Sequence, residues 1–259
     1  MFGLFSKKKP PEISQSPVDK RQNFHEVQFI AEYIKNETGI SFQKQASIFK
    51  SKLSSFCKQR GILSFNECLA KAKSNNEFKH ELFNYLTTNE TYFYREFGQI
   101  EKLVAKVAAS NKPVDILCLP CSTGEEPYTI VIALLEAGVA AEKFNLTGVD
   151  IDTAAVKCAI DGVYNARDVS KMPASLVAKY FVQKDDKYHL DEQIKSSVTF
   201  KAFNLFEPMM KSIGQFDFVL SRNMLIYFDK ETKLKASGIL VSLLKNKKNP
   251  IYYGHADLY

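Results

Sequence analysis

The stretch VDILCLPCSTGEEPY, residues 114–128, decides how this chain of 259 residues is interpreted. An apolar run from Val114 to Leu119 ends at Pro120, and a helical apolar pattern begins at Tyr128. A short apolar run followed by a tight loop and a helix predicts a strand buried on both faces, as in a parallel sheet covered by helices. The stretch therefore indicates an α/β fold.

The loop within this stretch differs from a dinucleotide-binding loop. It has one glycine, Gly124, where the dinucleotide fingerprint has three, and Glu125 and Glu126 follow it. Two carboxylates disfavour a pyrophosphate and favour a cationic or hydroxyl-bearing ligand. A bound nucleoside-type cofactor and an ordinary strand-to-helix turn both stay open on this stretch alone.

Polar residues follow the carboxyl ends of the other predicted strands. These strands cover residues 144–149, 198–203, 216–220 and 251–254. Asp150, Asn204 and Asn223 come directly after the first three or close behind them. In an open parallel sheet ligands bind at this edge, and an acidic residue after the second strand is placed to accept hydrogen bonds from ribose hydroxyls.

Two regions do not follow this alternation of strands and helices. Residues 168–197 predict a short helix and a small antiparallel hairpin, inserted as a β-subdomain. The first third predicts helices, over about 24–38, 41–59, 65–72 and 77–86. We therefore expect a disordered basic tail over 1–22, a helical domain over 23–86, a linker and connecting helix over 87–112, and an α/β domain with the inserted β-subdomain over 113–259.

The net charge of +6 arises in the first third of the chain, because residues 1–86 hold 14 lysines and arginines against 8 acidic residues. The predicted helix over 41–59 has no acidic residue. Its lysines are Lys44, Lys50, Lys52 and Lys58. This basic surface suits an acidic partner, although a merely solvated face is the commoner meaning of such a pattern.

Cysteine usage and hydropathy indicate a cytoplasmic protein without membrane insertion. The 5 cysteines are irregularly spaced, and neither a signal-peptide pattern nor a long apolar run is present. Cys118 and Cys121 form a C-x-x-C pair, but the second half of a zinc site is missing, so no metal is expected.

Several motifs together resemble one family. They are NETYFYRE (89–96), CSTGEEPY (121–128), Asp150-Ile151-Asp152, Asn204-Leu205 and RNMLIYFD (222–229). Over residues 24–257 the chain resembles the chemotaxis receptor methyltransferases of the CheR family. The resemblance implies a small all-α domain, followed by a Rossmann-like S-adenosylmethionine-dependent methyltransferase domain with an inserted β-subdomain. It also implies methyl transfer to receptor glutamates, which gives a glutamate methyl ester and S-adenosylhomocysteine.

The resemblance also implies roles for individual residues. The cofactor-binding residues would be Asn89, Thr91, Arg95, Glu125, Asp150, Asn204, Leu205, Asn223 and Met224. Among them, Glu125 would approach the methionine part of the cofactor and Asp150 the ribose. Arg95 and Tyr227 would lie nearest the methyl group and are the expected catalytic residues. The substrate-binding residues would be Lys44, Lys50, Lys52 and Lys58, which would meet acidic methylation helices of the receptor.

The implied chemistry needs no catalytic dyad. A glutamate side chain, with a pKa of about 4.3, is already an anion at neutral pH and needs no general base. Arg95 could orient this carboxylate, and aromatic rings could stabilise a sulfonium. We expect a monomer that does not bind nucleic acid. Two alternatives stay open: a methyltransferase acting on RNA or a small molecule, and a non-catalytic receptor-binding scaffold.

Overall fold

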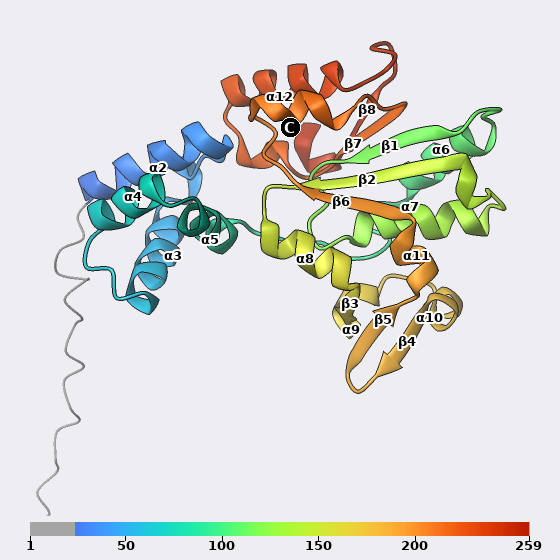
Figure 1. Cartoon of the computed structure of the whole chain (residues 1–259), viewed down its shortest axis with the longest axis horizontal. Coiled ribbons are helices and arrows are strands. Elements are labelled where there is room, and N and C mark those ends of the chain that lie inside the picture. The colour runs from blue at the N-terminus through green and yellow to red at the C-terminus, as the bar shows by residue number, and fades with distance from the viewer. Residues whose placement is uncertain (1–23, 259) are drawn as a thin grey trace, which may run out of the picture.

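The computed structural model describes residues 24–258 and shows a helical part joined to a larger α/β part (Figure 1). The tail expected over residues 1–22 lies outside the described residues. The helices of the first part are α2 (Phe24–Thr38), α3 (Ala46–Gln59), α4 (Phe65–Ser74) and α5 (Asn76–Leu86), with a short 3₁₀ turn η1 (Gln43–Gln45) before α3.

The helical part has a hydrophobic core of its own. Phe49, Phe56, Phe65 and Leu82 are at most 1% exposed and come from α3, α4 and α5. The helix predicted over 41–59 is divided in the structure, because the backbone of Gln45 leaves helical geometry at φ −133°. Ala46, the first residue of α3, is exposed.

A five-stranded parallel sheet forms the centre of the second part, in the order β6-β2-β1-β7-β8. The strands are β1 (Val114–Cys118), β2 (Phe144–Asp150), β6 (Val198–Ala202), β7 (Phe218–Ser221) and β8 (Ile251–Tyr253). This Rossmann-like arrangement confirms the predicted fold class. Since β1 is the central strand, the loop after it lies at the middle of the carboxyl edge.

Helices cover both faces of the sheet (Figure 1). One face meets α6 (Phe97–Ala108) and α7 (Glu125–Glu136), with α8 (Thr153–Asp161) beside β2 and β6; the other face meets α12 (Lys230–Ser242). Successive residues of β1 alternate between these layers. Ile116 and Cys118 pack with α6 and α7, whereas Leu117 packs with α12. This explains the unbroken apolar run, because both faces of the strand are buried.

The inserted β-subdomain is larger than the predicted hairpin. It contains β3 (Val163–Asn165), β4 (Phe181–Lys184) and β5 (Lys187–Leu190) in the antiparallel order β3-β5-β4, together with α9 (Ala166–Val169) and α10 (Ala174–Tyr180). The predicted hairpin is present. Strand β3 was not expected, and the subdomain begins before residue 168, where its start was predicted. Three residues are too few to show an alternating pattern. A short helix α11 (Glu192–Ser196) leads back to β6.

Hydrogen bonds join the helical part to the carboxyl edge of the sheet. The side chain of Asn204 donates to the Glu37 carbonyl at 2.5 Å, and the Ser41 N–H donates to the Tyr227 carbonyl at 2.8 Å. On the other side, the side chain of Asn84 donates to the Thr153 hydroxyl at 2.8 Å. The helical part thus closes over the edge where the polar residues gather.

Candidate functional site

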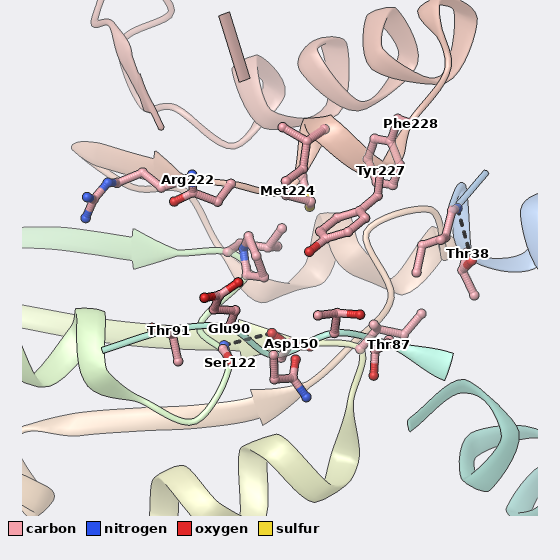
Figure 2. A pocket seen from close by; sticks show the side chains of 18 of the residues that line it. Thr38, Thr87, Glu90, Thr91, Ser122, Asp150, Arg222, Met224, Tyr227 and Phe228 are labelled. Atoms are coloured by element: carbon pink, nitrogen blue, oxygen red, sulfur yellow. Dashed lines mark hydrogen bonds between the residues drawn. The ribbon is translucent and has the colours of Figure 1, made fainter. Parts of the chain in front are cut away.

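A cavity of about 500 Å³ lies between the helical part and the carboxyl edge of the sheet. This volume is within the usual range for small-molecule sites. Its walls come from the connection between α2 and α3, the linker after α5, and the segments that follow β1, β2, β6 and β7. Figure 2 shows Asp150 and Tyr227 on opposite sides of this space, at the end of β2 and in the segment after β7.

The loop after β1 is shaped by close contacts. Gly124 has φ +96°, and a Cβ atom there would come within 2.9 Å of the Cβ of Ala159. Only glycine allows this conformation and this approach. The loop brings the Ser122 N–H within 2.8 Å of Asp150 Oδ2, so the loop and the end of β2 form one wall.

Asp150 is buried at 5% exposure and lines the cavity. Its carboxylate also accepts the N–H of Asp152 at 2.9 Å. Burial raises the pKa of Asp150 to about 6, although the backbone hydrogen bonds favour the charged form. An acceptor in this state suits a hydroxyl or cationic group of a ligand.

Asp152 ties the linker to the sheet, a role that the sequence did not reveal. Its side chain caps α8 by accepting the N–H groups of Ala154 and Ala155, and it also accepts from Thr87 Oγ1 at 2.8 Å and Asn89 Nδ2 at 2.6 Å. Thus Asn89 lines the cavity while its amide holds the linker in place. The available signal for this role was the position of Asp152 between the end of β2 and the start of α8.

Glu125 lies outside the residues that line the cavity, unlike the other expected cofactor ligands. It is the first residue of α7, is 2% exposed, and accepts the hydroxyl of Thr123 at 2.7 Å. Burial raises the pKa of Glu125 to about 7, and the Thr123 hydroxyl opposes this shift. A role toward the methionine part of the cofactor stays a proposal for this residue.

A buried ion-pair network forms the base of the cavity. The side chain of Arg222 is 1% exposed and pairs with Glu126 at 2.5 Å and with Glu96 at 3.5 Å. Arg222 also donates to the Arg95 carbonyl at 2.6 Å. Burial raises the pKa of Glu126, and Arg222 lowers it. The sequence indicated Glu126 as a loop carboxylate and Arg222 only as part of a motif, so their pairing was not predicted.

The linker contributes Thr91 and Arg95 to the cavity wall. Arg95 Nη1 donates to the Glu90 carbonyl at 2.6 Å, and its guanidinium lies 5.8 Å from the ring centroid of Tyr92. An arginine has five N–H donors, so further donors stay available for an incoming carboxylate.

The segments after β6 and β7 complete the wall. Leu205, Met224 and Tyr227 line the cavity, and Tyr227 lies in the 3₁₀ turn η4 (Leu225–Tyr227). Figure 2 shows the Tyr227 ring reaching into the space above Asp150. Burial raises the pKa of Tyr227, and nearby Arg95 opposes the shift. Asn204 also lines the cavity and accepts the Phe206 N–H at 3.0 Å.

The four lysines of the basic helix lie in different settings. Lys44 is exposed at the cavity, whereas Lys50 and Lys58 are exposed farther along α3 and do not line the cavity. Lys52 lines the cavity, but its ammonium lies 3.3 Å from the Leu86 carbonyl, the Thr87 carbonyl and the Thr88 hydroxyl. Lys52 therefore stabilises the end of α5, as a cation near a helix C-terminus does.

Several buried polar atoms around the cavity have no partner within the described part of the chain. They are Ser122 Oγ, Glu126 Oε1 and Asn223 Nδ2, and their residues line the cavity. Buried polar groups normally have a hydrogen-bond partner, so donors and acceptors gathered at one cavity indicate a polar ligand. With Asp150, this set suits a nucleoside carrying hydroxyls and a positive charge.

The buried carboxyls predict that the ligand-free protein loses stability as the pH rises from about 5.5 to about 8. The pKa values of Glu125 and Asp150 are about 7 and about 6 in the folded protein. In unfolded chains they are about 4.3 and about 3.9. The folded state therefore binds the protons more tightly. Their contribution is fully present below the unfolded values and is lost as the pH rises through the folded ones.

We expect this loss to be on the order of 2 kcal/mol, measured by urea unfolding at the two pH values. The variant Glu125→Gln with Asp150→Asn removes both titrations and should show a flatter dependence. A wild-type protein that is more stable at pH about 8 would contradict the assignment.

A polar cavity at the carboxyl edge of a Rossmann-like sheet is the usual location of a nucleoside cofactor. Within residues 24–258, no cluster of His, Cys, Asp and Glu could hold a metal ion, and no helix is long and apolar enough to cross a membrane. A family model described as the SAM binding domain of CheR methyltransferase matches residues 89–258. A second model, its all-alpha domain, matches residues 25–87.

Chemotaxis protein methyltransferases of known name are similar over most of the chain. The one from Campylobacter jejuni is 36% identical over 231 residues, which cover 88% of this chain and 87% of that protein. Chemotaxis protein methyltransferase 2 of Vibrio cholerae is 32% identical, over 87% of this chain and 83% of that protein. A solved structure of PKMT2 from Rickettsia typhi in complex with AdoHcy has a TM-score of 0.36 and 16% identity, and the similarity covers 64% of this chain and 25% of that one.

The class is thus an S-adenosylmethionine-dependent methyltransferase. The chain belongs to the CheR family, the methyltransferases of chemotaxis.

Proposed function

We propose that this protein transfers the methyl group of S-adenosylmethionine to glutamate side chains of methyl-accepting chemotaxis receptors. The observation that carries the proposal is the shape of the cavity. It combines unpaired buried polar atoms at the sheet edge with a mouth lined by Lys44 and an arginine on its wall. One end thus suits a nucleoside and the other an anionic side chain.

The cofactor supplies an activated methyl group on a sulfonium. We propose that Asp150, which lines the cavity, accepts hydrogen bonds from the ribose hydroxyls, and that Asn223 Nδ2 and Ser122 Oγ, which are unpaired, contact the rest of the molecule. Asn89, Thr91, Leu205 and Met224 contribute wall surface. These residues hold and orient the cofactor in our proposal, while Asn204 chiefly ties the wall to α2.

Arg95 and Tyr227 act on the incoming carboxylate in this proposal. A glutamate is ionised at neutral pH, so the enzyme needs to orient an oxygen and exclude water rather than remove a proton. The guanidinium of Arg95 can hold the carboxylate in two-pronged geometry. Since burial raises the pKa of Tyr227, its phenol keeps its proton and can donate a hydrogen bond.

The defining experiment is transfer of labelled methyl from S-adenosylmethionine to receptor-containing membranes. Glutamate methyl esters release labelled methanol in base, whereas methylated RNA bases and methylated amines do not. Base-labile label on the receptor band is the expected result. Label on RNA or on a small molecule, or binding without transfer, would point to the alternative functions.

The exposed lysines predict a salt-dependent contribution to receptor recognition. Lys44 and Lys50 are both exposed and Lys44 lines the cavity, whereas Lys52 is bonded to the end of α5. Lys44→Glu with Lys50→Glu should raise the apparent KM for receptor about threefold to tenfold at low salt and leave cofactor affinity unchanged. The difference should shrink as salt rises, because exposed charges are screened.

A matched control reverses two exposed lysines away from the cavity, Lys102→Glu with Lys112→Glu. This variant has the same change in net charge, so an equal rise in KM would indicate a general charge effect. If the Lys44 and Lys50 variant has the same KM as the wild type at every salt concentration, these lysines do not take part in receptor recognition.

A further inference from the structure

Asp257 connects the last helical turn of the described chain to the wall of the cavity. It lies in η5 (His255–Leu258), directly after β8, and is 6% exposed. Its carboxylate accepts the N–H groups of Asn223 at 2.5 Å, Gly254 at 3.1 Å and Ile226 at 3.2 Å. Asn223 and Ile226 line the cavity, whereas Asp257 is not among the lining residues.

The segment 223–227 needs such an attachment because its backbone is not part of a strand or an α-helix. Asn223 has φ +59°, in the left-handed region that residues other than glycine rarely adopt. The N–H groups of Asn223 and Ile226 therefore have no partner from regular secondary structure. Backbone donors in a packed region require an acceptor, and the carboxylate of Asp257 accepts both.

The end of β8 packs directly on this segment. A Cβ atom at Gly254 would lie 2.8 Å from both the backbone N and Nδ2 of Asn223, so only glycine allows the observed contact. Gln99 of α6 donates to the Tyr253 carbonyl at 2.9 Å and holds the end of β8 in place. Asp257 and Gly254 thus both contact Asn223, and neither lines the cavity.

Segment 223–227 carries much of the cavity's chemistry. Asn223 Nδ2 is one of the unpaired buried donors, and Met224 and Tyr227 line the same wall. From the other side, the Ser41 N–H bonds the Tyr227 carbonyl at 2.8 Å. The segment is thus held at its start by Asp257 and at its end by the helical part.

We propose that Asp257 is a positioning residue that holds segment 223–227 in the shape that binds the cofactor. It does so by accepting the N–H groups of Asn223 and Ile226, without contacting the cofactor itself. This inference rests on the proposed placement of the cofactor in the cavity, but it is independent of the identity of the methyl acceptor.

The test measures S-adenosylhomocysteine binding by calorimetry on the full chain, with wild type and Asp257→Asn. The amide of asparagine presents a donor where the structure has an acceptor, so one of the backbone bonds is lost. We expect the Kd to rise about tenfold to a hundredfold. Asp257→Glu keeps the carboxylate and should recover part of the affinity. Ala256→Ser, at the exposed neighbouring position, is the matched control.

Hydrogen exchange of the amides in segment 223–227 separates positioning from general stability. We expect faster exchange there in Asp257→Asn, well below its Tm, together with the weaker binding. A folded Asp257→Asn protein with wild-type Kd would overturn the proposal, even if its Tm were lower. Should Asp257→Asn not fold, hydrogen exchange of the wild type decides, because no added protection of segment 223–227 by bound S-adenosylhomocysteine would overturn the proposal equally. The binding and exchange measurements need no receptor. Their results therefore stay interpretable even if the protein does not methylate receptor glutamates.

Discussion

Replacing Arg222 by methionine is expected to lower the free energy of unfolding by about 3–5 kcal/mol. The Arg222 side chain is 1% exposed and pairs with Glu126 and Glu96. Methionine fills similar space but leaves the buried Glu126 carboxylate without a counter-charge. Such a carboxylate is costly in a low-dielectric interior. Urea unfolding at neutral pH measures the loss.

The second variant of this pair shows whether charge is the cause. Arg222→Met combined with Glu126→Gln removes both charges, and it should recover a large part of the lost stability. The loss in the single variant should also shrink at lower pH, because burial raises the pKa of Glu126 and protonation neutralises it. If Arg222→Met were as stable as wild type, the network would not stabilise the base of the cavity.

Replacing Arg95 by alanine is expected to lower methyl transfer about a hundredfold, as loss of substrate alignment does. Arg95 lines the cavity. Within the described chain, its guanidinium donates a hydrogen bond only to the Glu90 carbonyl. The side chain is partly exposed, so thermal stability should fall little. Arg95→Lys should also be impaired, since an ammonium cannot hold a carboxylate in two-pronged geometry. Initial rates with saturating cofactor measure both variants.

Arg167 offers a matched control for Arg95. It pairs with the carboxylate of the same Glu90 at 3.5 Å, but its side chain is 84% exposed and does not line the cavity. Arg167→Ala should therefore keep wild-type rates. Full activity in Arg95→Lys would argue against orientation of the carboxylate by Arg95.

Local patterns predicted the elements that place the site. The apolar run before Pro120 is strand β1, and the acidic residue predicted after the second strand, Asp150, is its last residue. Strand β3 was missed because three residues carry too little pattern. Lys52 was expected to face a partner, but it bonds the end of α5, since the spacing of charges along a helix does not show which neighbour lies beside it.

The sequence by itself determined the sheet, the polar residues at its carboxyl edge, and the family, because these depend on periodicity and on motifs that are local in the chain. Only the tertiary structure decided how distant polar groups meet. Arg222 and Glu126 lie 96 positions apart, Asn223 and Asp257 lie 34 apart, and neither pair shares a motif. A buried charge needs its partner within bonding distance, and that distance is set by how helices and strands pack rather than by the order of residues.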